Sequence, residues 1–129
     1  MKPQTAEWIE KAEGDWKVAC REFDCDAPVF DAVCFHAQQV VEKYLKALLE
    51  ERGITVPKTH DLLVLLDLQQ ESLHELEEWR NSLANLTTYS VAFRYPGEEA
   101  LFEDSEEALN TAKKVRARVR EELGLINNI

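Results

Sequence analysis

Glycine and proline are scarce in this sequence, which has four residues of each among 129. Because both residues interrupt helices, their scarcity favours long helices. Runs of β-branched residues bounded by turn residues, which indicate strands, are also few, whereas Ala, Leu, Glu, Lys and Arg are plentiful. We therefore expect an all-α protein, an antiparallel bundle of four or five helices formed by a single domain over residues 1–129.

The sequence also lacks a membrane-spanning segment and a cysteine framework. No apolar run approaches the ~20 residues that cross a bilayer, and no secretory leader is recognisable near Met1. Cys20, Cys25 and Cys34 are odd in number and form no CxxC pair, which argues against disulfides and against a structural metal site. We therefore expect a cytoplasmic protein that makes no membrane contact and carries no metal and no cofactor.

Positive charge is in deficit. The chain has 15 Lys and Arg residues against 25 Asp and Glu residues, which gives a net charge of -10. Affinity for nucleic acids comes largely from Lys and Arg that displace counterions at phosphates, so nonspecific binding of DNA or RNA is disfavoured. A local basic cleft can still hold a small anion, so a nucleotide remains a candidate ligand.

The common catalytic motifs are absent. The sequence contains no glycine-rich phosphate loop, no HExxH, no GxSxG and no regular carboxylate and histidine pattern of a di-iron bundle. We therefore predict no catalytic residue from these motifs, and we interpret the chain as a binding protein rather than an enzyme.

Turn and capping residues divide the chain into helices whose apolar residues recur at intervals of three and four. A fourth helix is expected to begin at Leu76. The start signals of the other helices are Thr5, Pro28, Thr59 and Asp104, and the stop signals are Gly53, Pro96 with Gly97, and Gly124. The helix over residues 28–52 is expected at the centre of the bundle, with a core stripe formed by Val33, Ala37, Val40, Val41, Tyr44 and Leu48.

A second, polar stripe follows the same helix away from its apolar side. It consists of His36, Gln39, Lys43 and Lys46, which lie at steps of three and four and therefore share one face. An imidazole, a carboxamide and two ammonium groups suit the phosphates and base edges of a nucleotide if another element closes over them. The alternative is a solvated face on which pairs such as Glu42 with Lys46 form surface salt bridges.

Two further segments offer candidate ligand-binding residues. His60 follows the expected cap Thr59 near a helix start, where backbone donors favour anions, and it either donates to a phosphate or fastens the helix entry to the bundle. Arg94 and Tyr95 precede Pro96 at a helix end, from which they could grip a phosphate and stack on a base. The alternative is that Arg94 complements the helix dipole and Tyr95 covers the edge of the core.

A dense basic run lies in the last helix, and we interpret it as solvated surface. Its residues scatter around the helix and lie toward its C-terminal half, where the helix dipole favours cations. They are Lys113, Lys114, Arg116, Arg118 and Arg120.

Three motifs, in this order, resemble those of the HEPN family. Residues 35–49 read FHAQQVVEKYLKALL, residues 59–62 read THDL, and Tyr89 precedes Arg94-Tyr95-Pro96. The similarity in helix order extends over nearly the whole chain. The resemblance implies an antiparallel helical bundle that usually dimerises and is often encoded beside a minimal nucleotidyltransferase, with nucleotide binding proposed for proteins of this type.

Many HEPN proteins are metal-independent ribonucleases that carry an arginine followed, after four to six residues, by a histidine. Arg80 begins a similar stretch here, but Asn85 stands where the shortest spacing would put the histidine, and asparagine cannot shuttle a proton. Arg52 does not restore the motif, because a predicted helix break separates it from His60. The resemblance therefore favours a noncatalytic member of the family.

The sequence thus leads to the hypothesis of a noncatalytic HEPN homodimer that binds a nucleotide, a minimal nucleotidyltransferase partner, or both, as in a toxin–antitoxin pair. One alternative is a ribonuclease toxin of the HEPN type, which would bind RNA, and another is a pure protein-interaction module. Lys43 and Arg94 are expected at the phosphate. The full set of predicted nucleotide-binding residues is His36, Gln39, Lys43, Lys46, His60, Arg94 and Tyr95.

Overall fold

The computed structural model describes residues 1–69, 77–93 and 95–125, and within these ranges it contains five helices and no strand. This confirms the predicted all-α bundle. No helix in the described ranges is long and apolar enough to cross a bilayer. The helices are α1 (Pro3–Asp24), α2 (Phe30–Glu51), α3 (Leu62–Asp67), α5 (Arg80–Ala92) and α6 (Phe102–Glu122).

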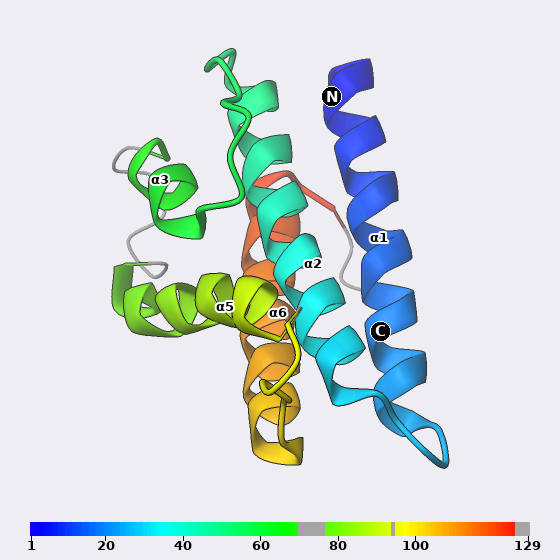
Figure 1. The fold of residues 1–129 in the computed structure, drawn as a ribbon. Helices are drawn as coiled ribbons and strands as arrows, with labels where there is room; N and C mark the ends of the chain where they lie inside the picture. The colour runs from blue at the N-terminus through cyan, green and yellow to red at the C-terminus, as the bar shows by residue number, and fades with distance from the viewer. Residues whose placement is uncertain (70–76, 94, 126–129) are drawn as a thin grey trace.

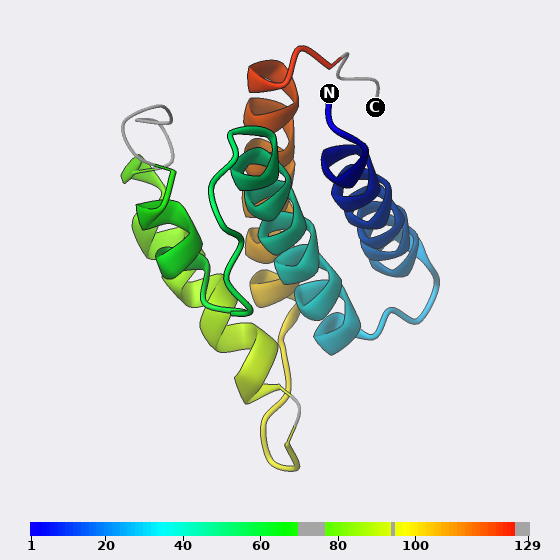
Figure 2. The same cartoon turned by 90° about the horizontal axis from the view of Figure 1, so that it is seen from above.

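The helix α2 lies at the centre of the bundle. α1 runs antiparallel beside it, α6 packs behind it, and α3 and α5 cover the side that faces away from α1 (Figures 1 and 2). α1 and α6 both pack extensively on α2 but make few contacts with each other. The polar residues of α2 therefore meet different neighbours on different faces of the same helix.

The predicted apolar stripe of α2 forms the middle of the core. Leu45 and Leu49 are buried as well, because α2 is covered by helices on several sides and its buried arc is wider than a single stripe. The residues of the predicted stripe, each no more than 1% exposed, are Val33, Ala37, Val40, Val41, Tyr44 and Leu48.

The first helix begins earlier than its predicted cap. α1 starts at Pro3, because the fixed φ of proline suits the first helical position and Lys2 precedes it as the N-cap. The prediction that Thr5 caps this helix is therefore wrong. Thr5 is buried in the first turn, and its hydroxyl donates a hydrogen bond to Oε1 of Glu51 at 2.9 Å, which joins the start of α1 to the end of α2.

The second helix begins later than predicted. α2 starts at Phe30, so Pro28 lies outside the helix instead of in its first turn. Oε2 of Glu22, on α1, accepts a hydrogen bond from the backbone N–H of Val29 at 2.9 Å. This contact between α1 and the connector holds the connector in an extended conformation through Val29, and α2 begins only after Val29.

The short helix α3 is capped by Asp61 and not by Thr59. The Asp61 carboxylate accepts a hydrogen bond from the backbone N–H of Leu63 at 3.0 Å, whereas the Thr59 hydroxyl accepts one from the N–H of Asp61 at 3.1 Å. The predicted cap, Thr59, is therefore wrong by two residues. His60 lies before the helix and not in its first turn. The expected attraction of the helix start for anions does not apply to His60.

The start of the last helix is also displaced from its prediction. Leu101 is the N-cap of α6, and Asp104 stands in its first turn, where its carboxylate accepts a hydrogen bond from the N–H of Leu101 at 2.8 Å. α5 begins at Arg80, and the predicted start at Leu76 lies outside the described residues. The predicted ends of α2 and α6 are closer to those observed. Gly53 and Gly124 follow these two helices with φ of 71° and 74°, in the left-handed region that glycine tolerates best.

We expect the replacement Asp61→Ala to lower the free energy of unfolding by about 1 kcal/mol, because the N–H of Leu63 loses its capping acceptor. Urea denaturation followed by circular dichroism would measure this loss. Thr59→Ala is the matched control, since its hydroxyl accepts a hydrogen bond outside the helix. An equal loss in both variants would contradict the assignment of Asp61 as the cap.

Candidate functional site

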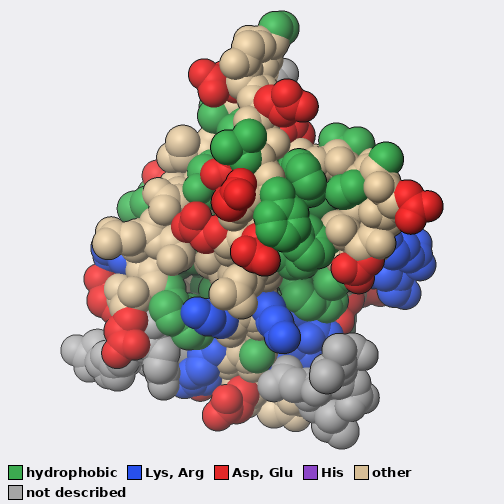
Figure 3. All heavy atoms as spheres, turned by 90° about the horizontal axis from the view of Figure 1, so that it is seen from below, with side chains coloured by type: hydrophobic (Ala, Val, Ile, Leu, Met, Phe, Trp, Pro, Cys, Tyr) green, Lys and Arg blue, Asp and Glu red, His purple; other side chains and the backbone are tan. Residues whose placement is uncertain are grey.

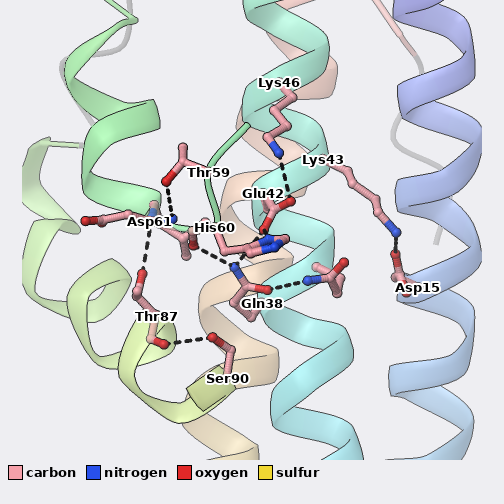
Figure 4. Close-up of polar contacts among 12 residues, drawn as sticks. Asp15, Gln38, Glu42, Lys43, Lys46, Thr59, His60, Asp61, Thr87 and Ser90 are labelled. Atoms are coloured by element: carbon pink, nitrogen blue, oxygen red, sulfur yellow. Dashed lines mark hydrogen bonds and ion pairs between the residues drawn. The ribbon is translucent and has the colours of Figure 1, made fainter. Parts of the chain in front are cut away.

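The polar stripe of α2 is divided between two carboxylates. On the side that faces α1, Nδ1 of His36 lies 2.8 Å from Oδ1 of Asp15, and the Lys43 ammonium donates to the other oxygen of the same carboxylate. Asp15 belongs to α1 and its side chain is only 12% exposed. One acidic residue of α1 therefore orients two of the predicted ligand-binding residues of α2 (Figure 4 shows Lys43 and Asp15).

The second carboxylate is Glu42, whose side chain is only 4% exposed. It accepts hydrogen bonds from Lys46 at 3.0 Å, from the His60 ring at 2.8 Å and from the Gln38 carboxamide at 3.1 Å (Figure 4). Burial alone would raise the pKa of Glu42, but the hydrogen bonds from His60, Lys46 and Gln38 outweigh it and hold the pKa below the usual value. Glu42 is therefore an ionised group inside the bundle.

This network fastens the segment before α3 to α2. The Gln38 carboxamide also donates to the backbone carbonyl of His60 at 3.1 Å, so both the ring and the main chain of His60 are held by α2. The alternative expectation, a surface salt bridge between Glu42 and Lys46, is correct about the two partners. The pair is buried instead of exposed, because the Lys46 side chain is only 7% exposed. The His60 ring, in contrast, is 79% exposed although its Nδ1 is held.

A cleft of 310 Å³ lies between the first turns of α2 and the end of α5, and we call it the α2–α5 cleft. Two of its rings, those of Tyr89 and Phe93, stack with centroids 5.3 Å apart, and Phe35 lies edge-on to His36 at the same centroid distance. His36 is half-buried there, with a side chain that is 28% exposed. The residues that line the cleft are Val29, Asp31, Ala32, Phe35, His36, Tyr89, Ser90 and Phe93.

The predicted binding residues are thus partly gathered. His36 meets the end of α5 in the α2–α5 cleft, Lys43 joins His36 through Asp15, and Lys46 and His60 meet on Glu42.

The other predicted residues lie at the margins of these groups. The Gln39 carboxamide donates to Oε1 of Gln38 at 2.7 Å, and it does not line the cleft. Tyr95, just beyond α5, is 63% exposed. Arg94 lies outside the described residues.

The sequence reasoning missed the acceptors of this site and the rings of the cleft. Glu42 and Gln38 were present in the motif of residues 35–49, and their positions one turn apart could have suggested a polar network. Asp15 had no signal, because the register of α1 against α2 is a tertiary property. Tyr89 belongs to the third motif of the family resemblance, but nothing in the sequence indicates that its ring and that of Phe93 line a cleft beside α2.

The ribonuclease-like stretch has structural partners. Arg80 forms ion pairs with Glu77 and Asp67, and the Asn85 carboxamide donates to Glu107 at 3.3 Å. Neither side chain contacts a histidine among the described residues. No group of three or more His, Cys, Asp or Glu residues suited to a metal ion occurs in the described ranges.

The basic run of α6 is only partly solvated. Lys113 and Lys114 are exposed as predicted, but Arg116 is buried, with two of its nitrogens 2.7 Å from the two carboxylate oxygens of Glu13. Its guanidinium also lies 5.3 Å from the centre of a Trp16 ring. The interpretation of Arg116 as surface is therefore wrong, because α1 supplies both a carboxylate and an indole where α6 approaches it.

Comparison with known proteins agrees with this architecture. The family model for the HEPN domain matches residues 5–122. The solved structure of TT1696 from Thermus thermophilus has a TM-score of 0.81 and 26% sequence identity, and the alignment covers 94% of this chain and 99% of that one. No curated protein matches the sequence. Because the family model spans nearly the whole bundle, the chain belongs to the HEPN domain family.

Proposed function

We propose that this HEPN domain protein is noncatalytic and binds a nucleotide, with a minimal nucleotidyltransferase as its protein partner, and that the base of the nucleotide occupies the α2–α5 cleft. The observation that carries the proposal is the composition of this cleft, which is lined by three aromatic rings and by an imidazole held in place by Asp15. Homodimerisation and a role in a toxin–antitoxin pair are further parts of the same proposal.

The chemistry of the cleft suits a base. A volume of 310 Å³ is near the lower limit of small-molecule sites, so it accommodates the base and leaves the phosphates outside. Aromatic faces stack on any base, and His36 offers a hydrogen bond to a base edge. Lys43, seven residues beyond His36 on the same side of α2, is the predicted phosphate ligand that the structure describes, although Asp15 offsets part of its charge.

The surroundings of the incomplete ribonuclease motif support a noncatalytic role. Arg80 is engaged by two carboxylates, which leaves its charge largely compensated, and Asn85 carries no group that exchanges a proton near neutral pH. Binding without catalysis is therefore the function that the described residues support best.

We expect Phe93→Ala to weaken nucleotide binding about tenfold, because one stacking face of the cleft is lost. Calorimetric titration with ATP, GTP and NAD would measure the affinity. Phe102→Ser, which changes an exposed aromatic residue at the start of α6, is the matched control and should bind as the wild type does. The proposal fails if none of the three nucleotides binds, or if Phe93→Ala binds as tightly as the control.

A further inference from the structure

The end of the bundle where α1 finishes and α6 begins exposes a cluster of apolar side chains. Leu101, Phe102 and Val29 are 63%, 46% and 55% exposed. The Phe102 ring stacks on Phe23 with centroids 5.6 Å apart and meets the edge of Phe30 at 5.9 Å, so these rings form one contiguous surface. Figure 3, which views this end, shows hydrophobic side chains gathered at the centre of the face.

A groove continues from this cluster along the outside of the bundle, and we call it the α1–α6 groove. It has a volume of 640 Å³, its apolar lining comes from Trp16, Cys20, Phe23 and Leu109, and Lys113 lines it from α6. It exists because α1 and α6 both pack on α2 but make few contacts with each other. No other described helix packs over it. The two helices that border it, α1 and α6, run in opposite directions along the bundle (Figure 1).

The surroundings of the cluster and of the adjacent part of the groove are acidic. Residues 22–31 contain four carboxylates and residues 95–112 contain six, and neither segment contains a lysine or an arginine. The two segments lie at the same end, since Asp31 accepts a hydrogen bond from the N–H of Ala100 at 2.7 Å. Figure 3 shows acidic side chains above and to both sides of the apolar centre, and Lys and Arg side chains below it.

Several of these carboxylates are not used by the fold. Glu103 and Glu106 line the groove from α6, and Asp24 stands at the end of α1. None of the three forms an ion pair with a lysine or arginine in the described part of the chain. Repulsion between unpaired carboxylates opposes their clustering, and a cationic partner would relieve it.

We propose that the α1–α6 groove and the adjoining Phe102 cluster bind a basic amphipathic helix of a partner protein. Leucine-like side chains of that helix fill the channel beside Trp16 and Leu109, and its Lys and Arg residues face Glu103, Glu106 and Asp24. A helix suits the site because a third helix packed between α1 and α6 buries its apolar stripe along the whole channel. This deepens the protein-partner half of the proposed function, and it shares Val29 but none of the aromatic rings with the α2–α5 cleft.

The charges favour a foreign partner over a second copy of this chain. The densest run of basic residues in this chain lies in α6, but Arg116 is buried against Glu13 and Arg118 is paired with Glu122. Lys113 and Lys114 are the exposed cations of that run. Exposed acidic residues flank the run along the helix, with Glu106 and Glu107 before it and Glu121 and Glu122 after it. A second copy would therefore bring more negative charge to a surface that is already acidic.

A labelled peptide of about 18 residues, built from leucine and lysine at helical spacing, is the probe. Fluorescence anisotropy would give its affinity for the wild type, for the double variant Glu103→Lys/Glu106→Lys, and for Phe102→Ser. Glu78→Lys/Glu121→Lys is the matched control, since it changes the net charge equally at exposed positions away from the groove. We expect Glu103→Lys/Glu106→Lys and Phe102→Ser to bind the peptide at least about tenfold more weakly than the wild type does. The control should bind it less than about threefold more weakly.

Equal losses in the two double variants, or equally tight binding of a counterpart peptide with glutamate in place of lysine, would overturn the proposal. Sedimentation that changes from dimer to monomer in Phe102→Ser would also overturn it, because a second copy would then cover the cluster. Peptide binding that is unchanged in Phe93→Ala, beside nucleotide binding that is unchanged in Phe102→Ser, would separate this site from the α2–α5 cleft.

Discussion

Replacing Glu42 by alanine is expected to lower the free energy of unfolding by roughly 3–5 kcal/mol, the range found when one member of a buried ion pair is removed. The Lys46 ammonium would remain in a site where its side chain is only 7% exposed, with no carboxylate to balance it. The Gln38 carboxamide would lose an acceptor as well. Loss of the contact to His60 adds little, because that ring is 79% exposed and water can replace the acceptor.

Two further variants separate charge from shape. Glu42→Gln keeps the size of the side chain and an acceptor oxygen, but it leaves the Lys46 charge unbalanced, so most of the loss should persist. Glu42→Gln combined with Lys46→Met removes both charges and should recover a large part of it. Urea denaturation at pH 7 gives the three free energies, and a loss below about 1 kcal/mol in Glu42→Ala would mean that Lys46 escapes to solvent.

The fold could be predicted from the sequence because the spacing of apolar residues in the central helix indicates which of its faces is buried. The stripe from Val33 to Leu48 requires apolar neighbours on one side of α2, and in a bundle the other helices provide these neighbours. Helix starts were less predictable. Thr5 and Thr59 are good capping residues by composition, but Pro3 and Asp61 compete with them a few residues away, and tertiary contacts such as that of Thr5 with Glu51 decide the outcome.

The candidate site was only half visible in the sequence. Periodicity placed His36 and Lys43 on one face of a helix, which is correct, but it does not say which residues of other helices oppose that face. Asp15 is 21 residues from His36 and 28 from Lys43, and only the packing of α1 against α2 brings these groups together. The same reason explains Arg116, which composition assigns to the surface and which Glu13, 103 residues away, draws into the bundle.

Arg116→Ala is expected to lower the free energy of unfolding by roughly 2–3 kcal/mol, less than the loss for Glu42, because the Glu13 side chain is 32% exposed and water can replace part of the lost contact. Two hydrogen bonds to Glu13 and the contact with the Trp16 ring disappear together. Arg116→Lys should recover only part of the loss, because an ammonium lacks both the fork and the flat face of a guanidinium.

The pH dependence distinguishes the ion pair from packing at this position. Burial alone would raise the pKa of Glu13, but the hydrogen bonds from Arg116 and Tyr44 outweigh it and leave the pKa below the ordinary value of 4.5. The stabilisation from a lowered carboxyl pKa is present above that ordinary value and is lost as the pH falls through the lowered one. The difference in unfolding free energy between the wild type and Arg116→Ala should therefore shrink as denaturation is repeated from pH 7 toward pH 3. A difference that stays constant would assign the loss to the packing of Arg116 over Trp16 instead of to its charge.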